Sequence, residues 1–330
     1  MRALAFIKYI KYITFRRMTN ALCSRLNYLL SCFGWVRYTH MPTFIAIEPA
    51  NYCMLHCPQC PVGMRATQPE EHALIPEAIW MRALNEAAPF AHTVIFHFQG
   101  EPLLHPDLPK MIRYAHHLKL FTMLSTNAQL LTPAAAEALV DAGLDYIIVS
   151  IDGLTEPTYS HYRVGGSLEK ALAGMRALAA YKKHKGYGPV IEMQCLYLKS
   201  NQHEWPLFRE KYRSFGADKI SMKTAQFYDF EHGHPDMPDD SRYSRYKRNP
   251  DGTYSLKKKL NNHCYRLWSG CVLTTDGTIL PCCFDKDHRF SLGNIGSNSL
   301  AEIMHGEAAQ CFRKQVTRKR ISIKMCNNCI

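Results

Sequence analysis

The N-terminal part of this chain has no acidic side chain before Glu48, and it has no long apolar run. Its longest uncharged stretch, residues 26–36, falls far short of the roughly 20 residues that a membrane-spanning helix needs. Basic side chains at positions 8, 11, 16 and 17 interrupt the segment, so we expect no secretory signal peptide. The basic residues that precede Glu48 are Arg2, Lys8, Lys11, Arg16, Arg17, Arg25 and Arg37.

Residues 1–42 are therefore expected to form a basic amphipathic helical extension. We favour a helix that caps the bottom of the next domain with its basic side in water, because periodic patterns more often report packed faces. The alternative is a helix that lies on an anionic membrane surface, which would give residues 1–40 a peripheral contact with the inner face of the membrane.

The net charge of +12 raises the question of nucleic-acid binding, since a second basic run lies near the C-terminus. No helix-turn-helix, zinc-finger or RNA-binding signature accompanies the charge, so we expect no nucleic-acid partner. A chain of 330 residues with 47% hydrophobic and 21% charged residues is ordinary for a globular protein and long enough for one large domain and a small one.

Thirteen cysteines stand in a chain without an expected secretory signal. Several of them form tight Cys-x2-Cys and Cys-x3-Cys groups, which in an intracellular protein indicate reduced metal ligands rather than disulfides. We therefore expect a cytoplasmic and anaerobic setting.

Strands and helices alternate between residues 43 and 230. The expected strands cover residues 44–48, 93–98, 121–125, 146–151, 190–198 and 219–223. Six strands separated by helices predict an α/β fold with a parallel sheet, a partial (β/α)6 TIM-like barrel that is open on one side. In such barrels the chemistry lies at the C-terminal ends of the strands.

Two further segments follow the expected barrel. Residues 231–262 read as a linker or active-site flap, and we interpret His232 and His234 there as solvated loop side chains. Residues 263–330 are expected to form a small cysteine-rich domain with a β-hairpin turning at Asp276-Gly277 and a helix near residues 299–305.

Directly after the first strand, three cysteines are separated by three and then two residues: Cys53, Cys57 and Cys60. Such a triad can hold three corners of one iron–sulfur cluster and leave the fourth iron open. A zinc site fits poorly because it normally takes four protein ligands, and chance clustering is the other alternative. The second strand ends in Gly100-Glu101-Pro102, a turn that would present backbone carbonyls and a carboxylate to a cationic group.

Together these two motifs resemble those of the radical S-adenosylmethionine (radical SAM) enzymes. The resemblance implies that Cys53, Cys57 and Cys60 hold a 4Fe–4S cluster whose open iron binds SAM, and that Arg163 binds the SAM carboxylate. It also assigns SAM contacts to residues at the strand ends, namely Gln99, Gly100, Glu101, Ser125, Asn127, Ser150 and Asp152. For Ser125, Asn127 and Ser150 the alternative is helix capping or turn hydrogen bonding. Gln59 departs from the aromatic residue that is frequent before the third cysteine, which weakens an expected stacking contact with adenine.

The C-terminal segment resembles the twitch or SPASM extension of radical SAM enzymes. That resemblance implies a second, auxiliary 4Fe–4S cluster with four cysteine ligands: Cys264, Cys282, Cys326 and Cys329. Cys271 could replace Cys264, Cys283 could replace Cys282, and Cys311 is a further spare. A zinc ribbon built from the same four cysteines is the alternative.

The family chemistry implies reductive cleavage of SAM to a 5′-deoxyadenosyl radical that abstracts hydrogen from an unidentified substrate, with flavodoxin or ferredoxin as electron donor. We expect the auxiliary cluster to accept an electron, giving net oxidation of a small molecule or an envelope-derived substrate. The segment before residue 43 is too short and too basic for an added peptide-recognition domain. A peptide or protein maturase is the alternative, and a non-catalytic iron–sulfur or zinc protein is a more remote one.

Overall fold

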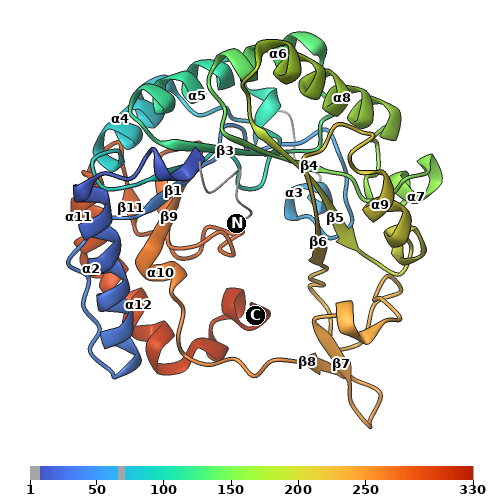
Figure 1. The fold of residues 1–330 in the computed structure, drawn as a ribbon. Helices are drawn as coiled ribbons and strands as arrows, with labels where there is room; N and C mark the ends of the chain where they lie inside the picture. Colours follow the sequence, from blue (N-terminus) through green and yellow to red (C-terminus); the bar gives the residue numbers. More distant parts are fainter. Residues whose placement is uncertain (1–7, 66–70, 330) are drawn as a thin grey trace.

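The computed structural model describes residues 8–65 and 71–329, so Arg2 of the basic segment and Ile330 of the C-terminal domain lie outside the described residues. Its main sheet has nine strands in the order β11-β10-β9-β1-β2-β3-β4-β5-β6. The six central strands are parallel neighbours in chain order: β1 (Phe44–Ile47), β2 (Thr93–Ile95), β3 (Phe121–Thr126), β4 (Tyr146–Ser150), β5 (Val190–Tyr197) and β6 (Lys219–Thr224). Figure 1 shows the sheet curving into an arc that stays open on one side, which confirms the partial barrel.

Helices cover the outer side of this arc (Figure 1). They are α4 (Glu77–Ala87), α5 (Leu108–His117), α6 (Pro133–Asp141), α7 (Glu156–Tyr162), α8 (Leu168–Lys185) and α9 (Trp205–Lys211). The main apolar core lies between these helices and the outward-facing strand residues, such as Val94, Leu124 and Ile147. The alternate strand positions therefore face the lumen, and this places polar strand-end side chains inside the barrel.

The C-terminal hairpin extends the barrel sheet. Its strands, β9 (Gly270–Leu273) and β10 (Thr278–Leu280), are joined at the expected turn, and β9 runs parallel to β1. A short strand, β11 (Gly293–Asn294), completes that edge. The hairpin thereby covers the edge of β1, whose backbone would otherwise be unpaired.

Three C-terminal helices follow or flank this hairpin: α10 (Arg266–Ser269), α11 (Leu300–His305) and α12 (Glu307–Lys319). The segment expected as linker or flap contains a small antiparallel hairpin, β7 (Tyr246–Arg248) and β8 (Tyr254–Leu256). In Figure 1 this hairpin stands at the open side of the barrel, beyond β6.

The N-terminal extension contains one long helix, α2 (Phe15–Cys32), capped by the Thr14 hydroxyl, which accepts from the N–H of Arg17. It packs beside α10 (Figure 1), and its C-terminal end lines one groove together with residues of α12. The described part of the basic segment thus contains a long helix, and the buried side of that helix is polar. The bounds of the extension and its capping role stay predictions. In the described part of the chain, no helix has the length and apolar character that crossing a membrane requires.

Candidate active site

The three cysteines Cys53, Cys57 and Cys60 lie in the loop that follows β1, and Cys60 stands just before the short helix α3 (Pro61–Met64). All three are free thiols. Burial raises the pKa of Cys53 to about 12 and that of Cys57 to about 11, and the pKa of each is raised further by the neighbouring cysteines. The three side chains are thus close enough to act on one another.

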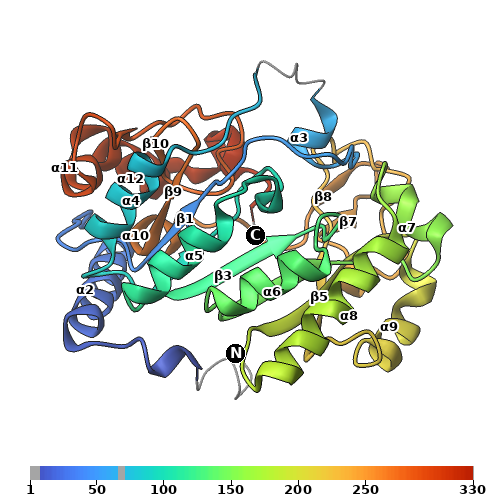
Figure 2. The same ribbon diagram turned by 90° about the horizontal axis from the view of Figure 1, so that it is seen from above.

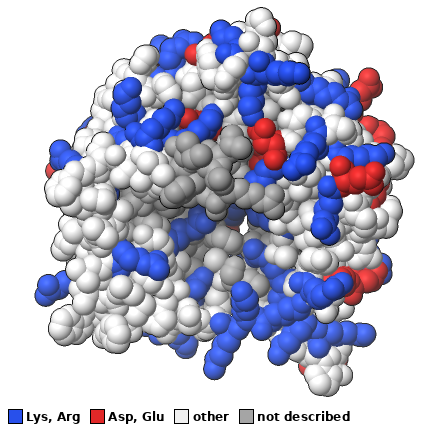
Figure 3. Space-filling model, viewed as in Figure 1, with Lys and Arg blue, Asp and Glu red and all other residues white. Residues whose placement is uncertain are grey.

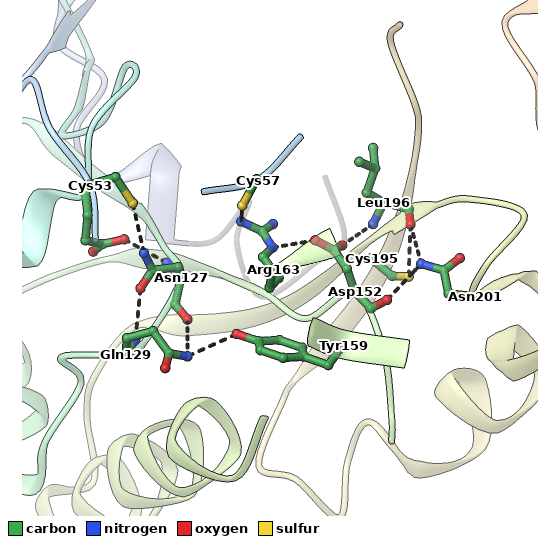
Figure 4. A network of polar contacts seen from close by, with 11 residues as sticks. Cys53, Cys57, Asn127, Gln129, Asp152, Tyr159, Arg163, Cys195, Leu196 and Asn201 are labelled. Carbon is green, nitrogen blue, oxygen red and sulfur yellow. Dashed lines mark hydrogen bonds and ion pairs between the residues drawn. The ribbon is translucent and has the colours of Figure 1, made fainter. Parts of the chain in front are cut away.

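Nitrogen donors surround two of these sulfurs (Figure 4). Cys53 Sγ accepts from the N–H of Leu55 and from Asn127 Nδ2, both at 3.4 Å, and Cys57 Sγ lies 3.9 Å from Arg163 Nη1. Such donors stabilise the thiolate form that ligates iron. In the described part of the chain, no three Cys, His, Asp or Glu side chains are arranged to hold a metal ion. The three cysteine side chains would therefore have to change rotamer to bind one cluster. The donor set and its surroundings fit an iron–sulfur cluster held on three cysteines.

The turn at Gly100-Glu101 is pressed against the cysteine loop. Glu101 N–H donates to the carbonyl of Tyr52 at 2.9 Å. A Cβ at Gly100 would come within 2.7 Å of that same carbonyl oxygen and still nearer to that of Ala50, so only glycine fits. This close approach positions the loop that carries Cys53.

The Glu101 carboxylate points into the protein. It accepts hydrogen bonds from the N–H of Leu103, the Thr126 hydroxyl and the N–H of Asn127, at 3.1, 2.6 and 2.8 Å. Burial raises the pKa of Glu101 above its ordinary value, and these donors oppose the rise. The side chain ties the turn to the end of β3, so a SAM contact at this residue would have to come from its backbone.

Gln99 and Glu48 lie together beneath the C-terminal domain. Gln99 N–H donates to Glu48 at 3.3 Å, and the Gln99 amide nitrogen donates to the carbonyl of Lys286 at 2.9 Å. Glu48 Oε2 has no hydrogen-bond partner among the described residues, and burial raises the pKa of Glu48 to about 7. Glu48 was not among the predicted site residues, although its place at the end of the first strand could have indicated it.

Asn127 connects the cysteine loop to two other elements (Figure 4). Besides its contact with Cys53, its Oδ1 accepts from the N–H of Gln129 at 2.9 Å, and Gln129 Nε2 donates to the hydroxyl of Tyr159 at 3.0 Å. The hydrogen bond to Gln129 is the turn interaction that we considered as an alternative for Asn127. Neither Gln129 nor Tyr159 was among the predicted residues.

Asp152 and Arg163 form an ion pair at the opposite side of the cysteine loop. Arg163 Nε donates to Asp152 Oδ2 at 2.5 Å, while Asp152 Oδ1 accepts from the N–H of Leu196 at 2.6 Å. Burial alone would lower the pKa of Arg163, but Asp152 and then Cys57 raise it well above its ordinary value. The guanidinium is thereby charged, fixed in direction and close to Cys57, and the Asp152 side chain acts through it.

Ser125 and Ser150 lie half-buried on β3 and β4, at strand positions whose neighbours pack outward. The helices that follow these strands are capped by Thr132 and Thr155, so neither serine is a helix cap. Their contact with SAM stays a prediction.

The C-terminal cysteines divide into two groups. Burial raises the pKa of Cys326, and Cys264 and Cys329 raise it further, although Arg320 opposes the rise. Burial would lower the pKa of Arg266, but Cys283, Cys282, Cys264 and Cys329 raise it above its ordinary value. Each of these five cysteines therefore lies within electrostatic reach of another one or of Arg266. Cys271 is different, because it is buried in the core: burial raises its pKa to about 12, and the charged side chain that opposes the rise is Arg313. This arrangement favours Cys264 over Cys271 as an auxiliary ligand.

Cys282 and Cys283 share a hydrogen bond, which together with Arg266 lowers the pKa of Cys283 to about 5 although burial opposes it. Arg266 Nη1 lies 3.2 Å from Cys283 Sγ. Cys282 belongs to the apolar core, whereas Cys283 is half-buried. Both residues line one cavity. The choice of Cys282 as ligand stays a prediction.

Two family models match the sequence of this chain. A model of the radical SAM superfamily matches residues 47–191, and a model of SPASM, an iron–sulfur cluster-binding domain, matches residues 264–330. The chain belongs to the radical SAM superfamily. It is an enzyme of the radical SAM type, with SAM and a 4Fe–4S cluster as cofactors, and the SPASM domain brings auxiliary iron–sulfur chemistry.

Two curated relatives are similar over part of this radical SAM chain. The AdoMet-dependent heme synthase of Methanosarcina barkeri is 33% identical over 144 residues, 43% of this chain and 41% of that protein. The PqqA peptide cyclase of Gluconobacter oxydans is 29% identical over 187 residues, 57% of this chain and 50% of that protein. The matches thus span half or less of these relatives' own lengths.

A solved structure shares the fold over most of both chains. BtrN in complex with AdoMet and 2-DOIA superposes with a TM-score of 0.54 at 18% identity, covering 88% of this chain and 94% of that one. At this identity the likeness concerns the fold alone.

Proposed function

We propose that this radical SAM enzyme oxidises an anionic organic substrate, a small molecule or an envelope-derived group, inside the barrel lumen. One observation carries the proposal: a cavity of about 170 Å³ reaches from His97 and Phe98, just beyond β2, to Cys282 and Cys283. A substrate group held there would contact both the mouth of the barrel and the auxiliary cysteines. That position suits an auxiliary cluster that accepts an electron from the substrate.

The lumen wall is cationic. Lys223, at the end of β6, and Lys286 line the cavity, and in the described part of the chain neither makes an ion pair. Burial and then the charge of Lys286 lower the pKa of Lys223, which means that an anion placed between them would relieve their repulsion. Figure 3 shows the molecule hollowed at its centre, with Lys and Arg side chains around the hollow. A carboxylate or phosphate on the substrate fits this wall.

When bound, SAM and the reduced 4Fe–4S cluster supply a 5′-deoxyadenosyl radical that takes a hydrogen atom from the substrate. In our proposal Cys53, Cys57 and Cys60 hold that cluster, and Arg163, fixed by Asp152, pairs with the SAM carboxylate. Gly100 sets the close approach of its turn to the cysteine loop. The auxiliary ligands are Cys264, Cys282, Cys326 and Cys329, and the electron donor is a flavodoxin or ferredoxin.

A peptide or protein maturase is the second candidate, because one relative is named a peptide cyclase. A non-catalytic iron–sulfur or zinc protein is the remote alternative, and the superfamily match weighs against it.

Deuterium transfer tests the proposal without a guess at the substrate. The reconstituted, reduced enzyme is incubated with deuterated cell extract that has been separated by anion exchange, and 5′-deoxyadenosine is examined for deuterium. We expect label from a retained, protease-resistant fraction. Label from a protease-sensitive fraction would establish the maturase instead, and label from the unretained fraction alone would refute an anionic substrate.

Two variants separate the steps. The triple variant Cys53→Ala, Cys57→Ala, Cys60→Ala should form no 5′-deoxyadenosine, whereas Lys223→Met should keep substrate-independent SAM cleavage and lose label transfer about tenfold or more. Normal label transfer by Lys223→Met would contradict the role of the cationic wall. Failure of the wild-type enzyme to cleave SAM at all would favour the non-catalytic alternative.

A further inference from the structure

The helix α2 turns its apolar face to solvent. Six large apolar side chains stand along one side of it and just beyond its end, and they are between 46% and 81% exposed: Phe15, Met18, Leu22, Leu26, Leu29 and Phe33. The next aromatic residue, Trp35, is 65% exposed. At about 100° per residue these positions fall on one stripe of the helix, which we call the apolar stripe. Soluble proteins rarely leave such a continuous patch uncovered.

The opposite side of α2 is polar and buried. Its buried residues are Arg17, Asn20, Ser24, Asn27 and Ser31. This polar side lies about 180° around the helix from the apolar stripe. The usual arrangement of a surface helix, with its apolar face on the core, is therefore reversed.

Hydrogen bonds hold α2 in this orientation. Arg17 Nη2 donates to the carbonyls of Ala88 and Leu118 at 2.7 and 2.9 Å, and Arg17 also contacts the carbonyls of Tyr12 and Lys119. Ser24 Oγ donates to the carbonyl of Trp268 at 2.8 Å.

Asn20 pairs with Met41 in both directions at 2.9 Å. Rolling the helix to bury the apolar stripe would break these bonds and leave buried carbonyls unpaired, so the exposed stripe is a built feature.

The charges beside the stripe indicate what covers it. Arg16 and Arg25 are exposed and flank the stripe on its two sides, and α2 contains no acidic residue. At the C-terminal end of α2 lies a groove of about 840 Å³ whose charged lining residues are Lys259, Lys314 and Arg318. Figure 3 shows little red on the side of the molecule where Figure 1 places α2.

We propose that α2 docks flat on a bilayer that contains anionic lipid, with the apolar stripe in the acyl boundary and the flanking cations at the headgroup phosphates. A helix of 18 residues is about 27 Å long. Over that length the apolar stripe would lie in the boundary between lipid headgroups and acyl chains. A second copy of this chain fits less well, because a symmetric contact would bring Arg16 and Arg25 against like charges without a carboxylate on either helix. Binding is peripheral.

Vesicle sedimentation of the reconstituted enzyme with residues 1–330 intact tests this docking. The probes are vesicles of phosphatidylcholine alone and vesicles with one third phosphatidylglycerol. We expect binding to the anionic vesicles that weakens steeply with salt. Leu22→Ser, Leu26→Ser should reduce that binding at least about tenfold, and Arg16→Gln, Arg25→Gln should reduce it by roughly fivefold per charge.

The matched control is Ile321→Ser, which removes an apolar side chain that is 62% exposed and lies outside α2, and it should bind like wild type. Because Leu22 and Leu26 are themselves exposed, their double variant should keep the wild-type melting temperature, which separates lost docking from lost folding. A wild-type enzyme that binds neither vesicle overturns the proposal. So does a stable dimer in sedimentation velocity that the Leu22→Ser, Leu26→Ser variant dissolves, since a second copy would then cover the stripe.

Discussion

Replacing Gly100 by alanine should remove most SAM cleavage, because the turn after β2 and the cysteine loop touch through their backbones at this point. The added Cβ would stand 2.7 Å from the carbonyl oxygen of Tyr52 and nearer still to that of Ala50. Both obstacles are backbone atoms, so no side-chain rotation relieves them. The turn or the loop must move by at least about 1 Å to restore ordinary contact distances.

That displacement sets the expected magnitudes. Overpacking of this kind costs roughly 1–3 kcal/mol of unfolding free energy. A shift of about 1 Å in the loop that carries Cys53 should lower the rate of SAM cleavage on the order of 100-fold, since catalytic geometry tolerates little displacement. The rate is measured as 5′-deoxyadenosine formed by the reconstituted, reduced enzyme, together with iron per chain and urea unfolding.

Gly186→Ala is the matched control. Gly186 ends α8 with φ of +72°, and no atom lies within 4 Å of the added Cβ. This variant should lose about 1 kcal/mol through backbone strain alone and cleave SAM at the wild-type rate. If Gly100→Ala cleaved SAM as fast as Gly186→Ala, the contact between turn and loop would not be what positions the cluster.

Three further outcomes follow from the site. Cys264→Ser should lower the iron content per chain by roughly half, whereas Cys271→Ser should leave the iron content unchanged. Equal losses would contradict the assignment of Cys264, and not Cys271, to the auxiliary cluster. Arg163→Lys should raise the KM for SAM about tenfold in initial-rate assays, because the lysine ammonium lacks the planar guanidinium that pairs with Asp152 and the SAM carboxylate at once. An unchanged KM would refute that pairing. Burial raises the pKa of Glu48 to about 7, so the free energy of unfolding should fall as pH rises from about 4.5 to 7. Glu48→Gln should remove this pH dependence and raise the free energy of unfolding by up to about 3 kcal/mol in urea unfolding at pH 8. No gain at pH 8 would show that ionising Glu48 does not destabilise the folded protein.

The parts of the fold that local sequence determines were predictable. The six strands carry β-branched or apolar runs between helix caps, and the hairpin turns at Asp276-Gly277, where the residue types themselves require a turn. The pairing of β9 with β1 was not predictable, because it joins strands more than 220 residues apart and depends on which sheet edge is free. The local sequence pattern does not indicate which edge of the sheet is unpaired.

The site divides in the same way. The spacing of Cys53, Cys57 and Cys60 indicates their shared role, but the inward direction of the Glu101 carboxylate depends on the donors at the end of β3. Periodicity also shows that α2 has two faces without showing which one is buried. The carbonyls that Arg17 satisfies come from segments far along the chain, so only the assembled fold selects the polar face.

The apolar stripe and the cysteine loop lie at opposite ends of β1. Asn20 of α2 binds Met41, just before β1, whereas Cys53 follows the other end of that strand. Figure 2 shows α2 and the helix α3, which follows the cysteine loop, toward opposite ends of the parallel strands. A bilayer under α2 would therefore leave the mouth of the barrel open to an electron donor and to substrate. It follows that Leu22→Ser, Leu26→Ser should weaken vesicle binding at least about tenfold and keep the wild-type rate of SAM cleavage. A parallel loss of cleavage would mean that α2 acts on the catalytic site itself.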